Sequence, residues 1–113
     1  MGLAGVAALK VPRKSYWEGV FEKSKSGLSR ADYPLEFGYL YVEEDRRKKG
    51  FGRMLIERTL ALAGSEGVFA TTREENTKVH PRLVEQGFQQ SGSPYKSRRG
   101  KFNLLLFVRS RGE

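Results

Sequence analysis

The chain of 113 residues contains no cysteine and a single histidine, His80. The absence of cysteine excludes disulfides, thiolate metal ligands and cysteine nucleophiles, and one histidine excludes a metal site built on several imidazoles. No apolar run approaches the roughly 20 residues that a membrane-spanning helix needs. The apolar N-terminal stretch lacks a preceding basic segment and a cleavage site, so we expect no signal peptide. These absences favour a cytoplasmic protein that binds no metal and does not enter the membrane.

Negative charge is also scarce. The chain carries 21 Lys and Arg against 13 Asp and Glu, which gives a formal net charge of +8 and a pI near 10.0. Such an excess of positive charge favours an anionic partner. The length predicts a single domain that spans residues 1–113.

Hydrophobic periodicity and turn residues predict alternating strands and helices, and hence an α/β fold with a mixed sheet. Residues 35–42 are apolar on both faces, which is typical of a central strand in a covered sheet. The predicted strands lie at residues 3–11, 35–42, 68–72, from 88 onward and at 101–108, and the predicted helices lie at 16–24, 53–63 and 81–86.

The segment 16–24 allows two interpretations. Its apolar residues recur with helical spacing after a Ser15-x-x-Glu18 helix-start signal, which favours a short amphipathic helix. Its aromatic residues and Gly19 favour a strand instead.

The segment joining strand 35–42 to the helix at 53–63 contains two glycines among basic residues. Glycine lets the backbone turn tightly and approach a ligand, and the first N–H groups of a helix are unpaired and carry partial positive charge. The sequence therefore predicts an anion site suited to phosphate. Neither a Walker motif nor a dinucleotide-binding fingerprint is present. The predicted site consists of Arg47, Lys48, Lys49, Gly50, Phe51, Gly52 and Arg53.

Three motifs in this order resemble those of the GNAT superfamily of acyl-CoA N-acyltransferases. Residues 47–52 are similar to its Arg/Gln-x-x-Gly-x-Gly/Ala loop, and Glu36 stands six positions before Val42, at the end of the preceding strand. Asn76 is followed by a Gly-Phe pair eleven and twelve positions later. The resemblance covers about residues 5–108. It implies a mixed, mostly antiparallel sheet flanked by helices and shortened at its N-terminus.

The resemblance also implies an activity, namely acetyl transfer from acetyl-CoA to a primary amine by direct attack. The glycine loop would then bind the pyrophosphate of coenzyme A. The main chain of Tyr41 and Val42 would bind the pantetheine arm, and the Val42 N–H would face the thioester oxygen. Asn76 would contact the same arm or its neighbouring backbone. Since only roughly one lysine-type amine in 2,500 is neutral at pH 7, a general base is needed, and Glu36 is the candidate.

Two departures from the family pattern keep other functions open. Leu83 stands where many family members carry a tyrosine that protonates the departing thiolate. Tyr95 or His80 would then have to take this role, or the thiolate leaves without help. The opening strand and two helices of the family are missing, which leaves the acceptor site undefined. A non-catalytic CoA-binding or interaction module is the alternative function. The basic cluster at residues 96–101 could bind a nucleic acid, but no stacking motif of an RNA-binding module accompanies it in the sequence.

The shortened N-terminus also leads to an expectation about partners. The first strand would lie at a bare edge of the sheet, which readily pairs with another chain. We therefore expect a second copy or a partner chain to cover it, beside a small-molecule or protein acceptor that supplies the amine.

Overall fold

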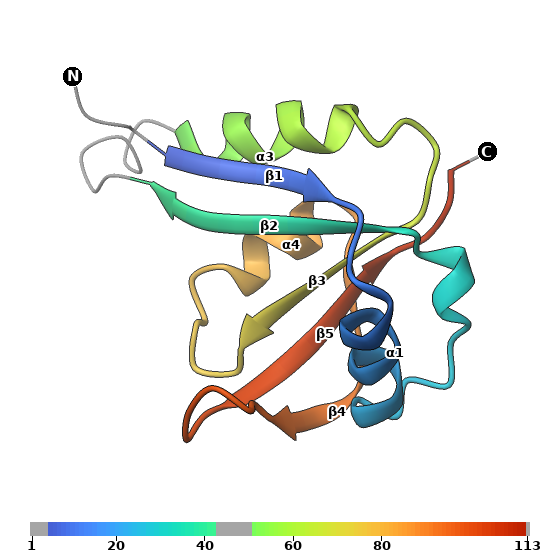
Figure 1. The fold of residues 1–113 in the computed structure, drawn as a ribbon. Helices are drawn as coiled ribbons and strands as arrows, with labels where there is room; N and C mark the ends of the chain where they lie inside the picture. Colours follow the sequence, from blue (N-terminus) through green and yellow to red (C-terminus); the bar gives the residue numbers. More distant parts are fainter. Residues whose placement is uncertain (1–4, 43–50, 113) are drawn as a thin grey trace.

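The computed structural model describes residues 5–42 and 51–112, which form one open sheet with helices on both faces (Figure 1). No helix in these residues is long and apolar enough to cross a membrane. The elements, in chain order, are β1 (Gly5–Lys10), α1 (Lys14–Lys23), a single 3₁₀ turn (Arg30–Asp32), β2 (Leu35–Val42), α3 (Phe51–Ala61), β3 (Val68–Arg73), α4 (His80–Glu85), β4 (Gln89–Lys96) and β5 (Asn103–Arg109).

The five strands lie in the order β1-β2-β3-β5-β4. Three of the four neighbouring pairs are antiparallel, and only β2 and β3 run parallel. The predicted mixed, mostly antiparallel sheet is therefore confirmed. β1 forms one edge of the sheet, as expected.

The parallel pair is short. β1 pairs with β2 along its whole length, from Gly5 opposite Val42 to Lys10 opposite Glu36, with one register shift between Val6 and Ala7. In the described residues, β2 pairs with β3 only at Leu35 and Glu36. Beyond Glu36 the two strands diverge toward their carboxyl ends (Figure 1). We use 'the opening' for this V-shaped divergence of the two backbones, whose narrow end lies at Glu36 (Figure 1).

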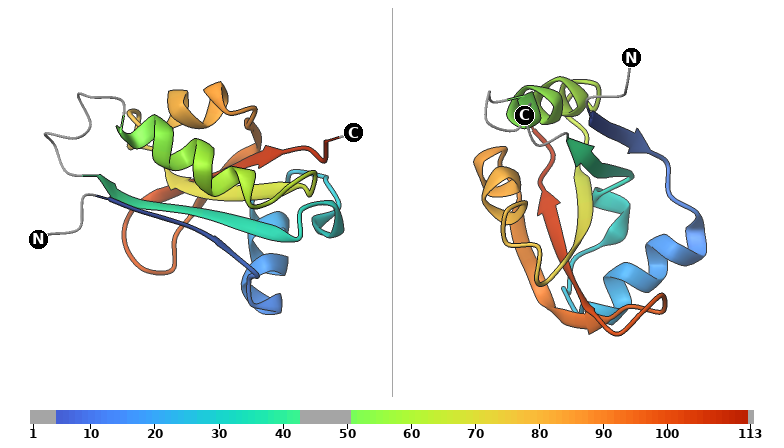
Figure 2. Two further views of the ribbon diagram at one scale, coloured as in Figure 1. Left: turned by 90° about the horizontal axis from the view of Figure 1, so that it is seen from above. Right: turned by 90° about the vertical axis from the view of Figure 1, so that its left-hand side faces the viewer.

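Helices α3 and α4 cover one face of the sheet, and α1 covers the other (Figure 2). Alternation of side chains along the strands divides the core accordingly. Phe37, Ala70 and Phe107 pack with α3 and α4, whereas Phe69, Leu106 and Val108 pack with Val20 and Phe21 of α1. Glu36, one residue before Phe37, therefore lies on the face that α1 covers.

Residues 14–23 form helix α1, so the strand alternative for the segment 16–24 is wrong. The Ser15-x-x-Glu18 start signal is also wrong. The helix begins at Lys14, its N-cap is Arg13, and no side chain caps it. Glu18 instead forms ion pairs with Lys14 and Arg30, at 3.9 and 3.5 Å.

The carboxyl end of α1 is attached to β4. Ser24, the helix C-cap, is completely buried, and its carbonyl oxygen accepts a hydrogen bond of 2.7 Å from the Ser93 N–H. The register of β4 with β5 shifts between Ser91 and Tyr95, and within this bulge Gly92 has φ +73°. A Cβ at position 92 would overlap the Ser24 carbonyl. The glycine thus lets β4 approach α1 and fixes the helix over the sheet.

We expect Gly92→Ala to lower the free energy of unfolding by about 2–4 kcal/mol, from the left-handed backbone and the overlap with Ser24 together. Gly19→Ala is the matched control, because an added Cβ on that residue of α1 meets nothing within 4 Å. It should stabilise the protein by up to about 1 kcal/mol. Urea denaturation of both variants measures the difference, and equal stabilities would contradict this account of Gly92.

Candidate active site

A buried carboxylate lies at the narrow end of the V-shaped opening. Glu36 is 8% exposed, and its side chain is on the face that α1 covers. The Tyr16 hydroxyl, from the first turn of α1, donates a hydrogen bond of 2.9 Å to Glu36 Oε2. The ammonium of Lys10 lies 3.8 Å from the other oxygen, Oε1. The two oxygens of the carboxylate thus face different partners.

Two further hydroxyls complete what we call the Glu36 cluster, which comprises Tyr16, Glu36, Thr71 and Tyr95. Thr71 Oγ1 lies 3.1 Å from the Tyr16 oxygen. Because the Tyr16 proton goes to Glu36, the Thr71 hydroxyl is the donor in this contact. Tyr95 lies opposite Leu104 of β5, and therefore on the same face of the sheet as Leu106 and α1. The structure thus places Glu36 and Tyr95, the two residues predicted to be catalytic, on the same face of the sheet.

The Tyr95 hydroxyl is buried and has no hydrogen-bond partner in the described part of the chain. Burial, with a smaller contribution from the charge of Glu36, raises the pKa of Tyr95 to about 12. The same two causes raise the pKa of Tyr16 above its ordinary value. Both phenols are therefore protonated at neutral pH, and Tyr95 has an unused donor beside the carboxylate.

His80 lies away from this cluster. Its Nε2 is 3.1 Å from the Arg73 carbonyl oxygen, and its ring centroid is 5.3 Å from that of Phe107. Phe107 belongs to the core beneath α3 and α4, on the opposite face from Glu36. Leu83 is buried in the same core. Of the two residues considered for assisting the thiolate, the structure places only Tyr95 near the predicted base.

The predicted phosphate site is described in part. Residues 47–50 lie outside the described residues. α3 begins at Phe51, so the backbone N–H groups of Phe51, Gly52 and Arg53 belong to its first turn, where such groups lack helical partners. This turn lies at the end of the sheet where β2 ends (Figures 1 and 2).

The Arg53 side chain has another partner. Its Nε lies 2.6 Å from Oε1 of Glu85 in α4. An ion pair between two helices explains the orientation of this arginine. The predicted contribution of Arg53 to phosphate binding therefore rests on its main-chain N–H rather than on its guanidinium.

The remaining predicted cofactor residues border the V-shaped opening. Tyr41 and Val42 end β2, and their main chain pairs with β1 on the other side. Asn76 is exposed in the turn after β3, where its N–H donates to the Arg73 carbonyl at 3.0 Å. The two arms of the opening thus carry the residues that sequence motifs assigned to one ligand.

The spacing along β2 decides whether Glu36 and Val42 can act on the same thioester. Glu36 and Val42 are six positions apart on one strand, and a rise of about 3.3 Å per residue separates their Cα atoms by about 20 Å. A thioester bound by the Val42 N–H would lie too far from Glu36 for one bridging water. If Glu36 is the base, the thioester must lie deeper in the opening, near residues 38–40.

Sequence reasoning missed Tyr16, Thr71 and Lys10. Tyr16 lies in a segment whose spacing indicates only an amphipathic helix, because a contact with Glu36, 20 positions away, leaves no local pattern. Lys10 could have been found, since it stands directly opposite Glu36 in the register of β1 and β2, and opposite charges favour such cross-strand positions.

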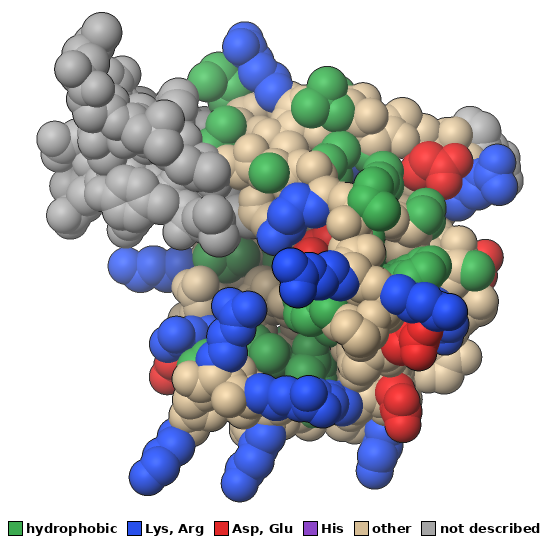
Figure 3. All heavy atoms as spheres, in the orientation of Figure 1, with side chains coloured by type: hydrophobic (Ala, Val, Ile, Leu, Met, Phe, Trp, Pro, Cys, Tyr) green, Lys and Arg blue, Asp and Glu red, His purple; other side chains and the backbone are tan. Residues whose placement is uncertain are grey.

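The basic cluster predicted at residues 96–101 forms the exposed turn between β4 and β5. In the described residues, no ion pair involves its four cations, Lys96, Arg98, Arg99 and Lys101. On the face seen in Figure 3, Lys and Arg side chains surround a recess whose floor is hydrophobic. This face of the molecule therefore carries many positive charges (Figure 3).

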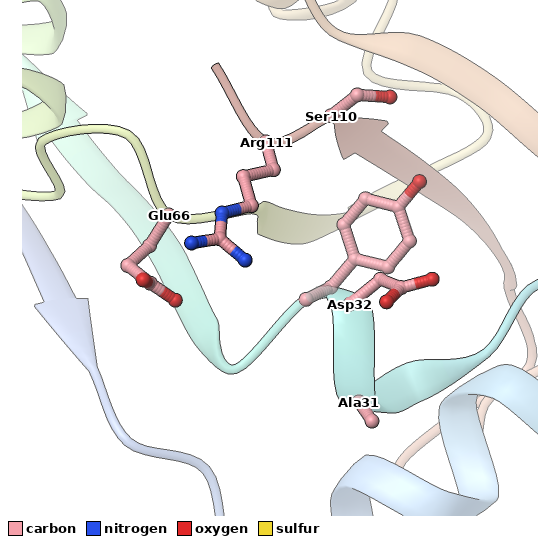
Figure 4. Close-up of a pocket in the computed structure, with 6 residues that line it drawn as sticks. Ala31, Asp32, Glu66, Ser110 and Arg111 are labelled. Carbon is pink, nitrogen blue, oxygen red and sulfur yellow. The ribbon is translucent and has the colours of Figure 1, made fainter. Parts of the chain in front are cut away.

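Two cavities lie elsewhere. One of about 290 Å³ is lined by Ala31, Asp32, Tyr33, Glu66, Ser110 and Arg111, and it lies where β2 and β3 begin (Figure 4). The other, of about 710 Å³, lies between α1 and residues 27–31. Neither Glu36 nor Tyr95 lines either cavity, so neither cavity belongs to the Glu36 cluster.

The sequence is similar to that of a known protein family. The sequence model of the acetyltransferase (GNAT) family matches residues 3–88. No curated protein matches the chain significantly.

Solved structures share the fold at low identity. A GNAT-family acetyltransferase from Streptococcus agalactiae 2603 superposes with a TM-score of 0.69 at 16% identity, over 97% of this chain and 60% of that one. NAA60 from Arabidopsis thaliana, solved with a bisubstrate analogue, gives 0.56 at 20% identity, over 67% of this chain and 48% of that one. The ribosomal-protein-S18-alanine N-acetyltransferase from Escherichia coli gives 0.53 at 11% identity, over 96% of each chain. The chain thus spans about half to 60% of the length of two of these proteins.

The two phenols should differ in their effect on stability at pH 7. Tyr16→Phe removes the donor to Glu36 and should lower the free energy of unfolding by about 1–2 kcal/mol. Tyr95→Phe removes a buried hydroxyl without a described partner, so it should leave stability unchanged or raise it. Urea denaturation of both variants provides the measurement, and a larger loss for Tyr95→Phe would refute these assignments.

Alkaline pH should destabilise the protein through Tyr95. The folded state keeps the phenol proton up to a pKa of about 12, whereas the unfolded chain releases it near pH 10. The unfolded state then binds fewer protons, so the free energy of unfolding falls as pH rises from 10 to 12, by at most about 3 kcal/mol from this group. Denaturation at several pH values should show a smaller fall in Tyr95→Phe. A tyrosinate absorbance titration that places Tyr95 near 10 would disprove the raised pKa.

Proposed function

The chain belongs to the GNAT acetyltransferase family, and we propose that it is an acetyl-CoA-dependent N-acetyltransferase that acts on a primary amine by direct attack. The observation that carries this proposal is the position of Glu36. A buried carboxylate lies where β2 and β3 part, on the same face of the sheet as a phenol whose hydroxyl has no described partner. A carboxylate placed in this way can accept the proton of an attacking amine.

Coenzyme A would enter from the open end of the V. Its pyrophosphate would bind the loop at residues 47–50 and the first N–H groups of α3, at Phe51, Gly52 and Arg53, because a helix N-terminus favours anions. The pantetheine arm would then follow the main chain of Tyr41 and Val42 inward, with Asn76 on the opposite arm of the opening. Its thioester would reach residues 38–40, within reach of the Glu36 cluster.

Glu36 would take the proton as the neutral amine attacks the thioester carbon. A C–N bond forms, the C–S bond breaks, and coenzyme A leaves as a thiolate. Transfer of the Tyr95 proton to a thiolate of ordinary pKa near 8.5 would cost about 5 kcal/mol. We therefore assign Tyr95 the role of a hydrogen-bond donor to the departing sulfur, with solvent supplying the final proton.

A non-catalytic module that binds coenzyme A is the second candidate. One observation favours it, since both oxygens of Glu36 already face a partner, Tyr16 at one and Lys10 at the other. The buried Leu83 also supplies no acid. The basic turn at residues 96–101 is compatible with a nucleic acid, but no stacking platform of an RNA-binding module accompanies it in the sequence.

Partners and location are further parts of the proposal. β1 is an edge strand, and its free edge supports pairing with a second copy of the chain or another protein. The family acts on amines, so the acceptor would be a small molecule or a protein with a free amine. We propose that the reaction takes place in the cytoplasm, where acetyl-CoA is available.

Two substitutions separate chemistry from cofactor binding. Glu36→Gln should lower the rate of acetyl transfer about 100-fold or more while acetyl-CoA still binds. Gly52→Asp should abolish binding itself, because bulk and negative charge would face the pyrophosphate. Glu18→Gln is the matched control, since this half-buried glutamate forms ion pairs with Lys14 and Arg30 alone among the described residues, and it should change neither property.

Calorimetric titration with acetyl-CoA measures binding, and release of free thiol in the presence of lysine and a peptide with a free N-terminus measures transfer. Binding without any release in the unmodified protein would favour the non-catalytic module. Unaltered binding in Gly52→Asp would reject the proposed cofactor site.

A further inference from the structure

An amine of the chain itself lies beside the proposed base. Lys10 is the last residue of β1 and stands opposite Glu36 in the antiparallel register. Its Nζ lies 3.8 Å from Glu36 Oε1. Because Tyr16 donates to Oε2, the remaining oxygen of the carboxylate is the one that faces the Lys10 amine.

The Lys10 side chain extends along β2 toward the opening. A Cβ built on Gly38 would lie 3.3 Å from Lys10 Cε and 3.4 Å from its Nζ. The lysine thus occupies the space that the missing side chain of Gly38 leaves free. Gly38 follows Glu36 by two positions on the same face of the strand, in the direction in which β2 and β3 diverge. The amine therefore lies between the carboxylate and the place where the thioester is expected.

We propose that Lys10 is an intramolecular acetyl acceptor, so that the protein acetylates its own Lys10 Nζ in the presence of acetyl-CoA. This inference rests on the proposed function, because acetyl-CoA supplies the acyl group. The neutral Lys10 amine attacks the thioester carbon, a C–N bond forms and the C–S bond breaks. Glu36 takes the proton that the amine loses, and the thiolate leaves and is protonated by solvent.

Accessibility supports a reaction rather than a sealed ion pair. The Lys10 side chain is 53% exposed, so it can exchange between the carboxylate and solvent. A distance of 3.8 Å is also longer than a charge-assisted hydrogen bond, which is typically about 2.7–2.9 Å. Holding amine and thioester in one site raises the rate of their reaction well above that of free molecules.

The chain provides a matched control for chemical acetylation. Lys14 Nζ lies 3.9 Å from Glu18 Oε1, and its side chain is 82% exposed. Lys14 therefore has a carboxylate at nearly the same distance as Lys10 and is more accessible, but it lies on the outer surface of α1. If acetyl-CoA modifies lysines without catalysis, Lys14 should react at least as fast as Lys10.

The test is peptide mass spectrometry of the full chain after incubation with acetyl-CoA, starting from protein that lacks acetyl groups. We expect Lys10 to be acetylated about 100-fold faster than Lys14, with a first-order rate that does not depend on protein concentration. Glu36→Gln should remove the preference for Lys10, and Lys10→Arg should remove the modification without raising that of Lys14. Circular dichroism of both variants checks that they fold.

Three results would overturn the inference, namely equal acetylation of Lys10 and Lys14, an unchanged preference in Glu36→Gln, and a rate that rises with protein concentration. The same samples separate this failure from that of the proposed function. If lysine and the peptide accept acetyl groups while Lys10 stays unmodified, only the self-acetylation is rejected. If acetyl-CoA neither binds nor releases thiol, both proposals fail.

Discussion

The short parallel pairing between β2 and β3 is the constraint on which the rest of the site depends. Main-chain hydrogen bonds normally continue along neighbouring strands because unpaired polar groups are costly to bury. Here the described register ends at Glu36, while β1 continues to support β2 as far as Val42. One strand thus keeps a firm partner on one side as far as Val42, while its described pairing with β3 on the other side ends at Glu36. Under the proposed function, the main chain of residues 38–42 would supply amides to an extended ligand such as pantetheine.

The helix over the opposite face determines what lies at the narrow end of this opening. α1 is held at its carboxyl end through the buried Ser24 and the bulge at Gly92, and its first turn brings Tyr16 to Glu36. The phenol orients the carboxylate and leaves its other oxygen to face the Lys10 amine. Tyr95, from the far edge strand, adds a donor that has no described protein partner. Catalysis by positioned groups of this kind depends on fixing them before the substrate arrives.

Much of the fold could be predicted from the sequence because its signals are local. The apolar faces of residues 35–42, the periodicity of residues 53–63 and the Gly87 stop after α4 each act over a few residues. The family motifs then predicted a mixed, mostly antiparallel sheet and Glu36 as the candidate base. Local signals failed at Ser15 and Glu18, where the helix already begins at Lys14 and ion pairs with Lys14 and Arg30 engage the glutamate.

The contacts within the site could not be predicted in the same way. Tyr16, Glu36, Thr71 and Tyr95 come from four elements, and only the packing of α1 across the sheet brings them together. A strand register could have paired Lys10 with Glu36, but the placement of its amine over Gly38 depends on the three-dimensional arrangement. Arg53 illustrates the same limit, because its position in a basic motif predicted phosphate binding, whereas α4 supplies Glu85 as its partner.

The most direct test of this account is an amide NMR titration of the full chain with acetyl-CoA. Binding in the opening predicts that the largest shifts occur at the amides of residues 38–42 and 51–53, on the arm that β2 and the start of α3 provide. Shifts confined to the turn at residues 96–101, or to the cavity near Arg111, would contradict the central claim that the parting of β2 and β3 forms the cofactor site.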